Sequence, residues 1–344
     1  MISIVSVLLS FSLSFILCML MIRFNLSATP TERCSHNAPT PTAGGVSFAL
    51  IFISYLSYLF LTGTIAQSPL IYNYLISVCI LLIVSFFDDC KPLSYRVRLL
   101  TQLVCALLLV MGGGTIESPV INIQSDSVLL FQKILTVFTL LSLINATNFI
   151  DGLNGLLSLC IMIALGFAGF WIDFYQPLLH MHWVLIAAIL GFFVLNFPKG
   201  KIFMGDTGST FLGLTLGFFA LIAQTHYPVS TTHGTAIFNK GFIFTLLPMA
   251  FLWFDVIATL CRRIARGEHL AEAHRDHMIH ILFDKGYKHV FVTFLYALST
   301  IFMGCLTYQC HMERISFIML LGIYILFQIL FVVFVFNVPS RKSL

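Results

Sequence analysis

The sequence has few charged residues. Only 9% of its 344 residues are Asp, Glu, Lys or Arg, whereas 59% are hydrophobic and the mean hydropathy is +0.98. Soluble domains carry about 25% charged residues, so this composition excludes a soluble protein. Apolar runs close to the roughly 20 residues that cross a bilayer recur along the chain, which indicates a polytopic membrane protein.

Several enzyme signatures are also missing. No GxxxxGK[ST] loop and no GxGxxG turn occur, which argues against a nucleoside triphosphatase and a dinucleotide enzyme. A CDP-alcohol phosphatidyltransferase would need a DGxxAR segment leading into GxxxDxxxD, and the chain has none. The nine cysteines are scattered without CxxC or Cys/His zinc spacing, so we expect free thiols.

Eleven apolar segments are candidates for membrane spans. The predicted fold is an all-α polytopic membrane protein with about 11 transmembrane helices (10 are possible), forming one integral-membrane domain over residues 1–344. The first segment lacks a basic n-region and a small-residue cleavage site, so we expect a retained helix with its N-terminus outside. The segments are 2–22, 46–62, 70–87, 97–111, 129–147, 155–172, 182–197, 208–226, 241–261, 290–310 and 315–337.

The basic residues predict the orientation. With the N-terminus outside, fifteen of the eighteen Lys and Arg residues fall on the cytoplasmic side, and only Lys133, Lys240 and Arg314 fall outside. This distribution satisfies the positive-inside rule. The net charge of +4 is therefore a topology signal, and it gives no reason to expect a nucleic-acid partner.

Two adjacent acids end one apolar segment on the predicted cytoplasmic side. Asp88 and Asp89 follow LISVCILLIVSFF directly, at the helix end whose dipole disfavours negative charge. Such a pair needs a cation. Lys91 would provide it in a structural network, and Mg²⁺ would provide it in a functional site.

A third acid, Asp206, lies in NFPKGKIFMGDTGSTFLG between two apolar runs. Gly205 and Gly208 allow a tight turn, and the start of the following helix offers free N–H groups that suit a phosphate or a metal-bound phosphate. The alternative is that Asp206 serves only as a helix N-cap.

The segment NATNFIDGLNGL places more polar side chains at the same side. Its two glycines predict a turn between helices, and its amide and acid side chains exceed what helix capping needs. These residues, spaced by three, are Asn145, Asn148, Asp151 and Asn154.

Two cytoplasmic loops carry candidate contacts for an anion. In the first loop, Arg33 and His36 are either interfacial charges or substrate contacts. The last large loop holds His274, Arg275, His277 and His280, where a histidine spacing of three is compatible with zinc but lacks a fourth ligand. An anionic, phosphate-bearing ligand fits these residues better.

One acid lies inside an apolar segment. Asp255 sits in FLWFDVIATLCRR, where an ionisable residue is either functional or paired. We expect Arg262, seven residues on and on the same helix face, to be its partner.

Five polar segments of the chain resemble those of a known family. The segments PTPTAGG, FFDDCKPLSYRVRLLTQ, NATNFIDGLNGL, FPKGKIFMGDTGSTFLG and RRIARGEHLAEAHRDH are similar to the successive cytoplasmic signatures of the polyprenyl-phosphate N-acetylhexosamine-1-phosphate transferases. They cover most of the chain in family order. The AHRDH form of the last loop resembles the branch that initiates O-antigen synthesis.

The resemblance implies an activity. The family transfers a sugar 1-phosphate from a UDP-N-acetylaminosugar to undecaprenyl phosphate, uses Mg²⁺ (Mn²⁺ is a possible substitute), and releases UMP at the cytoplasmic face of the bacterial inner membrane. Asp206 and Asp151 would be metal ligands, and Asp88 and Asp89 would orient or deprotonate the lipid phosphate. Substrate contacts would come from Asn145, Asn148, Asp151, Asn154, Phe203, His274, Arg275, His277, His280, Arg33 and His36, with Phe203 stacking on the uracil.

Three departures from the family pattern leave the sugar open. The family usually has aspartate at Asn154, a basic residue within the segment that here reads PTPTAGG, and in this branch often glutamine at His280. The alternatives are a phospho-MurNAc-pentapeptide translocase reaction and, in a different class, a secondary transporter, whose acids would lie near the bilayer midplane. The sequence leaves the oligomeric state open, a homodimer included.

Overall fold

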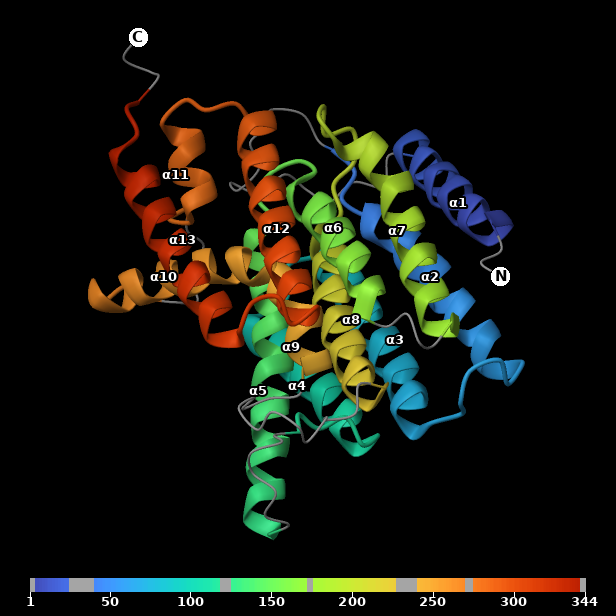
Figure 1. Ribbon diagram of the computed structural model, residues 1–344. Coiled ribbons are helices and arrows are strands. Elements are labelled where there is room, and N and C mark those ends of the chain that lie inside the picture. The colour runs from blue at the N-terminus through green and yellow to red at the C-terminus, as the bar shows by residue number, and fades with distance from the viewer. Residues whose placement is uncertain are drawn as a thin grey trace.

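The structure, a computed structural model, describes residues 4–24, 40–117, 125–171, 176–226, 240–269 and 275–340. These ranges form a bundle of helices joined by turns and short loops, without β-strands (Figure 1). The helices are α1 (Ile4–Arg23), α2 (Gly44–Leu61), α3 (Pro69–Cys90), α4 (Tyr95–Met111), α5 (Asp126–Ile150), α6 (Leu156–Trp171), α7 (Gln176–Asn196), α8 (Gly205–His226), α9 (Lys240–Leu246), η1 (Leu247–Met249), α10 (Ala250–Ala265), α11 (Met278–Asp284), α12 (His289–His311) and α13 (Phe317–Asn337).

Each of the eleven predicted segments coincides with a helix or a helical stretch. Eight described stretches are long and apolar enough to cross a membrane, and α6 and α7 contain shorter apolar stretches. The predicted segment 97–111 corresponds to α4. The prediction of an all-α polytopic membrane protein is confirmed.

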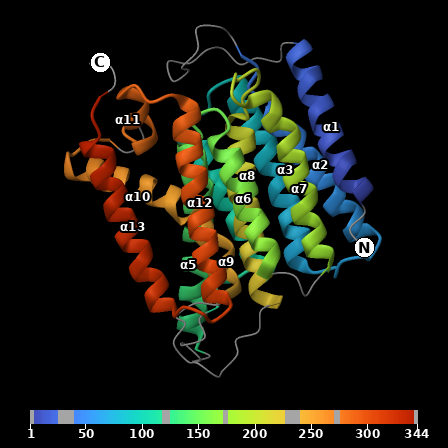
Figure 2. The same ribbon diagram turned by 45° about the horizontal axis from the view of Figure 1, so that its top comes forward.

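The predicted segment 241–261 differs from a simple span. It is divided into α9, the 3₁₀ turn η1 and α10, with Pro248 inside the turn. Proline lacks an N–H donor and clashes with the preceding helical turn, so the helix breaks there. After the break α10 runs across the bundle rather than along it (Figures 1 and 2).

Helix α8 forms the centre of the bundle and contacts α2, α3, α5 and α9 (Figure 2). In its most apolar stretch 94% of the residues are buried. Small residues allow the close approach, because a Cβ at Gly213 would collide with Thr147 of α5. The Tyr74 hydroxyl of α3 lies 2.7 Å from the Thr215 hydroxyl, which adds a polar contact inside the bundle.

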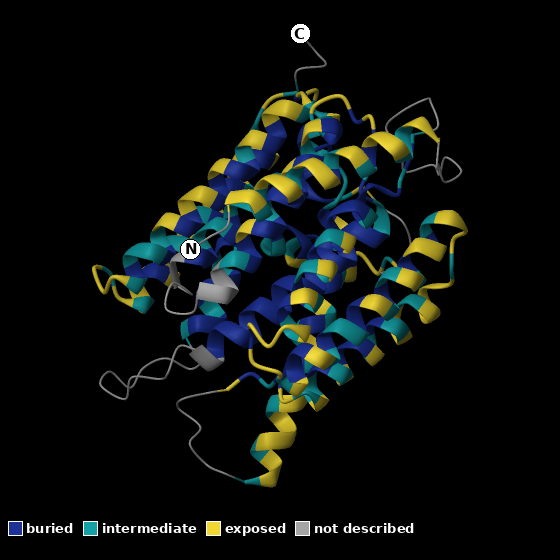
Figure 3. Ribbon diagram, turned by 90° about the vertical axis from the view of Figure 1, so that its right-hand side faces the viewer, coloured by how far each residue is buried: buried dark blue, intermediate teal, exposed yellow. Residues whose placement is uncertain are grey.

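The surface of the bundle is apolar where a bilayer would surround it. Buried residues line the interior and exposed residues lie on the outer helices (Figure 3). On α13, Ile318 and Leu330 are among the exposed large apolar side chains. Side chains are therefore buried where helices pack against each other, and the outward apolar faces are those that lipid would cover.

Candidate active site

The carboxylate of Asp89, in the last turn of α3, caps the start of α8. Its Oδ1 accepts the backbone N–H of Asp206 at 2.7 Å, and its Oδ2 accepts the backbone N–H of Thr207 at 3.0 Å and the Thr207 hydroxyl at 2.5 Å. A helix start has unpaired N–H groups and a positive dipole end, both of which favour an anion. The reading of Asp206 as the N-cap is therefore wrong, since α3 supplies the capping carboxylate.

Arg98, in the first turns of α4, joins the other two carboxylates. One guanidinium nitrogen lies 3.3 Å from Asp88 Oδ2 and 3.2 Å from Asp206 Oδ2. Asp88 Oδ1 also accepts the backbone N–H of Leu93 at 2.6 Å. The cation beside the acids is thus Arg98 rather than Lys91, and it ties α3, α4 and α8 together at one end of the bundle.

The start of α2 packs against the same loop. The N–H groups of Gly44 and Gly45 donate to the carbonyls of Phe203 and Met204 at 2.9 and 3.0 Å. The next residue, Gly205, has a φ of +70°, which strains a non-glycine residue, and a Cβ there would collide with the capping carboxylate from α3. The glycine is needed at this position on both grounds.

Asp151 and Asn148, at the end of α5, lie beside the aspartates. The Asn148 amide donates to the Ser209 hydroxyl in the first turn of α8 at 3.0 Å. Burial, together with the charges of Asp206 and Asp89, raises the pKa of Asp151 from 3.8 to about 8. A cation near these groups would offset the repulsion and favour the ionised carboxylate.

The other two asparagines of this segment face the helical framework. The Asn145 amide donates to Gln102 Oε1 of α4 at 2.6 Å. The Asn154 amide donates to the Pro198 carbonyl at 3.3 Å, in the turn that carries Lys199. Asn154 thus holds the α7–α8 connection, where an aspartate could not donate.

The last loop meets the α5 corner through its histidines. His280 on α11 lies against Gly152, because a Cβ there would come within 2.7 Å of the imidazole Cε1. Burial, followed by the charges of Arg275 and His277, lowers the pKa of His280 from 6.5 to about 4, so this imidazole is neutral at pH 7. His277 is buried, with its ring centroid 6.4 Å from that of Phe149.

Arg275 faces α11, and three further predicted residues cannot be placed. Arg275 lies 3.7 Å from Asp284 and its guanidinium stacks over Phe283 at 6.0 Å. The predicted contacts His274, Arg33 and His36 lie outside the described residues.

The expected pairing of Asp255 with Arg262 is wrong. Arg262 donates to the Thr259 hydroxyl at 2.9 Å and to the Asp276 carbonyl at 2.7 Å. Asp255 accepts the Tyr296 hydroxyl at 2.6 Å instead. Asp255 and Arg262 are seven residues apart and therefore share a helix face. The Arg262 side chain nevertheless bonds to the backbone of Asp276, which follows α10 in the chain.

The donor set suits a divalent metal that binds together with a substrate phosphate. In the described parts of the chain, no three Asp, Glu, His or Cys side chains form a complete metal cage. Two carboxylates, Asp88 and Asp206, do converge, on one nitrogen of Arg98. Mg²⁺ is usually held by one or two carboxylates and by substrate phosphates, so the arrangement fits it.

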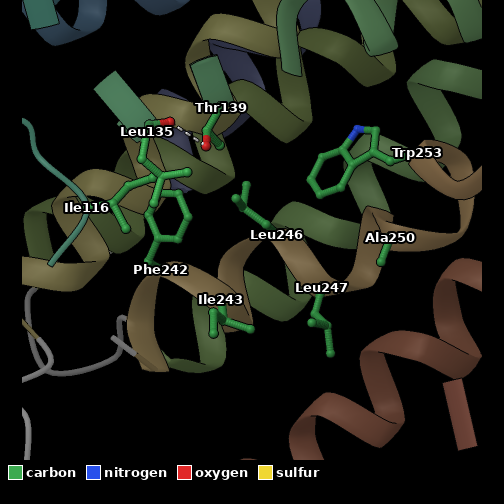
Figure 4. A pocket seen from close by; sticks show the side chains of 9 residues that line it. All are labelled: Ile116, Leu135, Thr139, Phe242, Ile243, Leu246, Leu247, Ala250 and Trp253. Carbon is green, nitrogen blue, oxygen red and sulfur yellow. Dashed lines mark hydrogen bonds between the residues drawn. The ribbon is translucent and has the colours of Figure 1, made fainter. Parts of the chain in front are cut away.

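An apolar pocket of about 280 Å³ opens beside the break between α9 and α10 (Figure 4). Its lining comes from Ile116 in the α4–α5 connection, from α5, and from both sides of the break, with Leu246 before it and Trp253 after it (Figure 4). The full lining is Ile116, Leu135, Thr139, Phe242, Ile243, Leu246, Leu247, Ala250 and Trp253. Such a lining accommodates hydrocarbon.

The comparison with known proteins finds a matching family model. The sequence model of glycosyl transferase family 4 matches residues 71–224, which span α3 to α8 and contain all four aspartates of the site. Over these residues the chain is similar to glycosyl transferase family 4. This family match bears out the resemblance given by the motifs.

Curated relatives extend the similarity beyond the residues that the family model matches. The chain is 29% identical over 78% of its length to a decaprenyl-phosphate N-acetylglucosaminephosphotransferase of Mycolicibacterium smegmatis, of which it covers 71%. It is 27% identical to a probable undecaprenyl-phosphate N-acetylglucosaminyl 1-phosphate transferase of Bacillus subtilis, over 79% of this chain and 74% of that protein. An undecaprenyl-phosphate alpha-N-acetylglucosaminyl 1-phosphate transferase of Salmonella typhi is 28% identical, over 77% of this chain and 71% of that protein.

The sequence motifs did not point to one central residue of this site. Arg98 was counted only as a topology signal, although it contacts two of the four aspartates. Its place in the first turns of α4, ten residues after Asp88, was a usable signal. A cation three residues into a helix that starts beside two acids lies within reach of them.

Proposed function

We propose that the chain transfers an N-acetylaminosugar 1-phosphate from a UDP-sugar to undecaprenyl phosphate, releases UMP, and so initiates a lipid-linked O-antigen or related envelope polysaccharide. One observation carries the proposal. Carboxylates from α3 and α8, joined by Arg98, lie with Asp151 at one end of a membrane-spanning bundle. The printed names of the relatives support the polyprenyl phosphate acceptor. A transporter would hold its acids near the bilayer midplane.

The chemistry needs charge neutralisation and alignment. An oxygen of the lipid phosphate attacks the phosphorus that bears the sugar, a new P–O bond forms, and the bond to the UMP oxygen breaks. One phosphoanhydride replaces another, so no net proton is consumed. Mg²⁺, when bound with Asp206 and Asp88, would neutralise the diphosphate. Arg98, Asn148 and Asp151 would keep these groups aligned.

Direct attack by the lipid phosphate is favoured because both carboxylates at the end of α3 are already bound by hydrogen-bond and ion-pair partners. Asp89 accepts three hydrogen bonds from the start of α8, and Asp88 accepts the Leu93 N–H and contacts Arg98. Hydrogen bonding and ion pairing weaken a carboxylate as a nucleophile. We therefore expect no exchange of labelled UMP into UDP-sugar in rigorously delipidated enzyme. Robust exchange without lipid, abolished by Asp88→Asn, would instead show a covalent route.

We propose that the pocket between α5, α9 and α10 binds part of the prenyl chain. It is apolar, and most of its lining residues belong to segments that are long and apolar enough to cross a membrane. Each buried CH₂ contributes about 0.8 kcal/mol, so even a few isoprene units there would hold the acceptor at the protein.

UMP release by the purified protein tests the activity. The assay offers undecaprenyl phosphate, Mg²⁺ and a panel of UDP-N-acetylaminosugars that includes UDP-MurNAc-pentapeptide. We expect lipid-dependent UMP release with at least one simple N-acetylaminosugar, and its absence with Asp206→Asn. Turnover of the pentapeptide substrate alone would favour the translocase reaction, and no release with any sugar would contradict the proposal.

Reporter fusions test the proposed placement in the bacterial inner membrane with the site facing the cytoplasm. The basic residues predict a cytoplasmic end after Lys201 and an external end after Met312. A periplasmic reporter that is active after Lys201 would overturn this orientation.

A further inference from the structure

A fully buried acid lies next to the last loop but outside the aspartate cluster. Asp255, on α10, is 0% exposed. Its Oδ1 accepts the backbone N–H of Met278 at 2.8 Å, and its Oδ2 faces the N–H of Ile279 at 3.4 Å and accepts the Tyr296 hydroxyl at 2.6 Å. A buried carboxylate is costly unless hydrogen bonds satisfy it, and these bonds do so.

The carboxylate also faces an imidazole. His277 Nδ1 lies 3.6 Å from Asp255 Oδ1, and His277 is only 3% exposed. A carboxylate that faces Nδ1 orients the imidazole ring. The ring lies near Phe149, two residues before Asp151.

The same anchor sets the position of α11. Met278 and Ile279 are the first two residues of that helix, so Asp255 caps it as Asp89 caps α8. The next residue, His280, lies against Gly152 in the α5 corner. The distance between α11 and the aspartate site is therefore set by a carboxylate on α10 and a hydroxyl on α12.

We propose that Asp255, supported by Tyr296, is a positioning residue for the transfer reaction: it holds His277 and the start of α11 against the α5 corner. Asp255 touches neither substrate nor metal in this role and acts through His277. The inference rests on the proposed function, because the reaction supplies its readout.

A double-mutant cycle tests the coupling. Asp255→Asn and His277→Gln should each lower kcat/KM for the UDP-sugar by roughly 10- to 100-fold, the usual cost of losing an orienting partner or of misplacing a contact. If Asp255 acts through His277, the double variant should lose no more than the worse single variant. Losses that multiply, or a fully active Asp255→Asn, would overturn the proposal.

Two further variants keep the test decisive. Tyr296→Phe removes only the hydroxyl that Asp255 accepts, and it replaces Asp255→Asn in the cycle if that variant does not fold. Tyr324→Phe is the matched control, because this phenol also donates to α10, to the Ala250 carbonyl at 2.9 Å, but does not reach Asp255. It should stay within twofold of the parent protein, and its effect should multiply with that of His277→Gln.

Amide exchange gives a readout without turnover. Exchange of the 278–284 segment should rise in Asp255→Asn and stay unchanged in Tyr324→Phe. Turnover by the unmutated protein distinguishes failure of the proposed function from failure of this inference. If it turns over no UDP-sugar, the proposed function fails, whereas turnover combined with multiplying losses in the cycle removes only this inference.

Discussion

Replacement of Asp89 by asparagine separates capping from catalysis. In the structure both carboxylate oxygens are used, one by the Asp206 N–H and the other by the Thr207 N–H and hydroxyl. Asparagine keeps one acceptor oxygen and places an NH₂ group where the second oxygen was. One backbone N–H at the start of α8 then loses its acceptor.

The size of the effect follows from that lost acceptor. A buried donor left without a partner costs about 1–3 kcal/mol, which is roughly a 5- to 150-fold change in the local opening equilibrium. We expect Asp89→Asn to lower the free energy of unfolding by about this amount, and turnover to fall because Asp206 sits in the same helical turn.

Hydrogen exchange of the peptide covering residues 204–212, in detergent, measures the effect directly. Asp88→Asn is the matched control, since Asp88 lies next to Asp89 on α3 but its backbone donor is Leu93, outside α8. Exchange at the start of α8 should increase in Asp89→Asn and not in the control. Lost turnover with parental exchange and stability would refute the capping argument and return Asp89 to a direct chemical role.

Three other predictions concern the charged cluster. Asp206→Asn should abolish Mg²⁺-dependent UMP release in a folded protein, because an amide is a poor Mg²⁺ ligand, and near-normal activity would exclude the metal role. Arg98→Met removes the cation between Asp88 and Asp206, so thermal stability should fall without Mg²⁺ and recover when Mg²⁺ is added; a loss that Mg²⁺ does not reverse would contradict this reading. The pKa of Asp151 is raised from 3.8 to about 8, so the folded state holds this proton more tightly and stability without metal should decline as pH rises from about 4 to 8. Mg²⁺ should stabilise the protein increasingly toward pH 8, Asp151→Asn should flatten both trends, and an unchanged pH profile in that variant would show that another group titrates.

The apolar pattern alone predicted the long helices, although it did not predict the short helix α11. Segments that cannot leave the bilayer must satisfy their own backbone bonds, so hydropathy predicts spans such as α3, α5 and α13 closely. The predicted segment 241–261 is also a candidate span, but it contains Pro248 and is interrupted by the turn η1. Hydropathy carries no information about direction, so the turn of α10 across the bundle could not be read from it.

The sequence also predicted which acids gather, and the tertiary structure decided what each one contacts. Helix ends on one side of a membrane must lie at one surface, so the sequence alone groups Asp88, Asp89, Asp151 and Asp206. Their hydrogen bonds depend on distances of a few ångströms between helices. Only packing decided that Asp89 caps α8, that Arg98 joins Asp88 to Asp206, and that Asp255 faces His277 instead of Arg262.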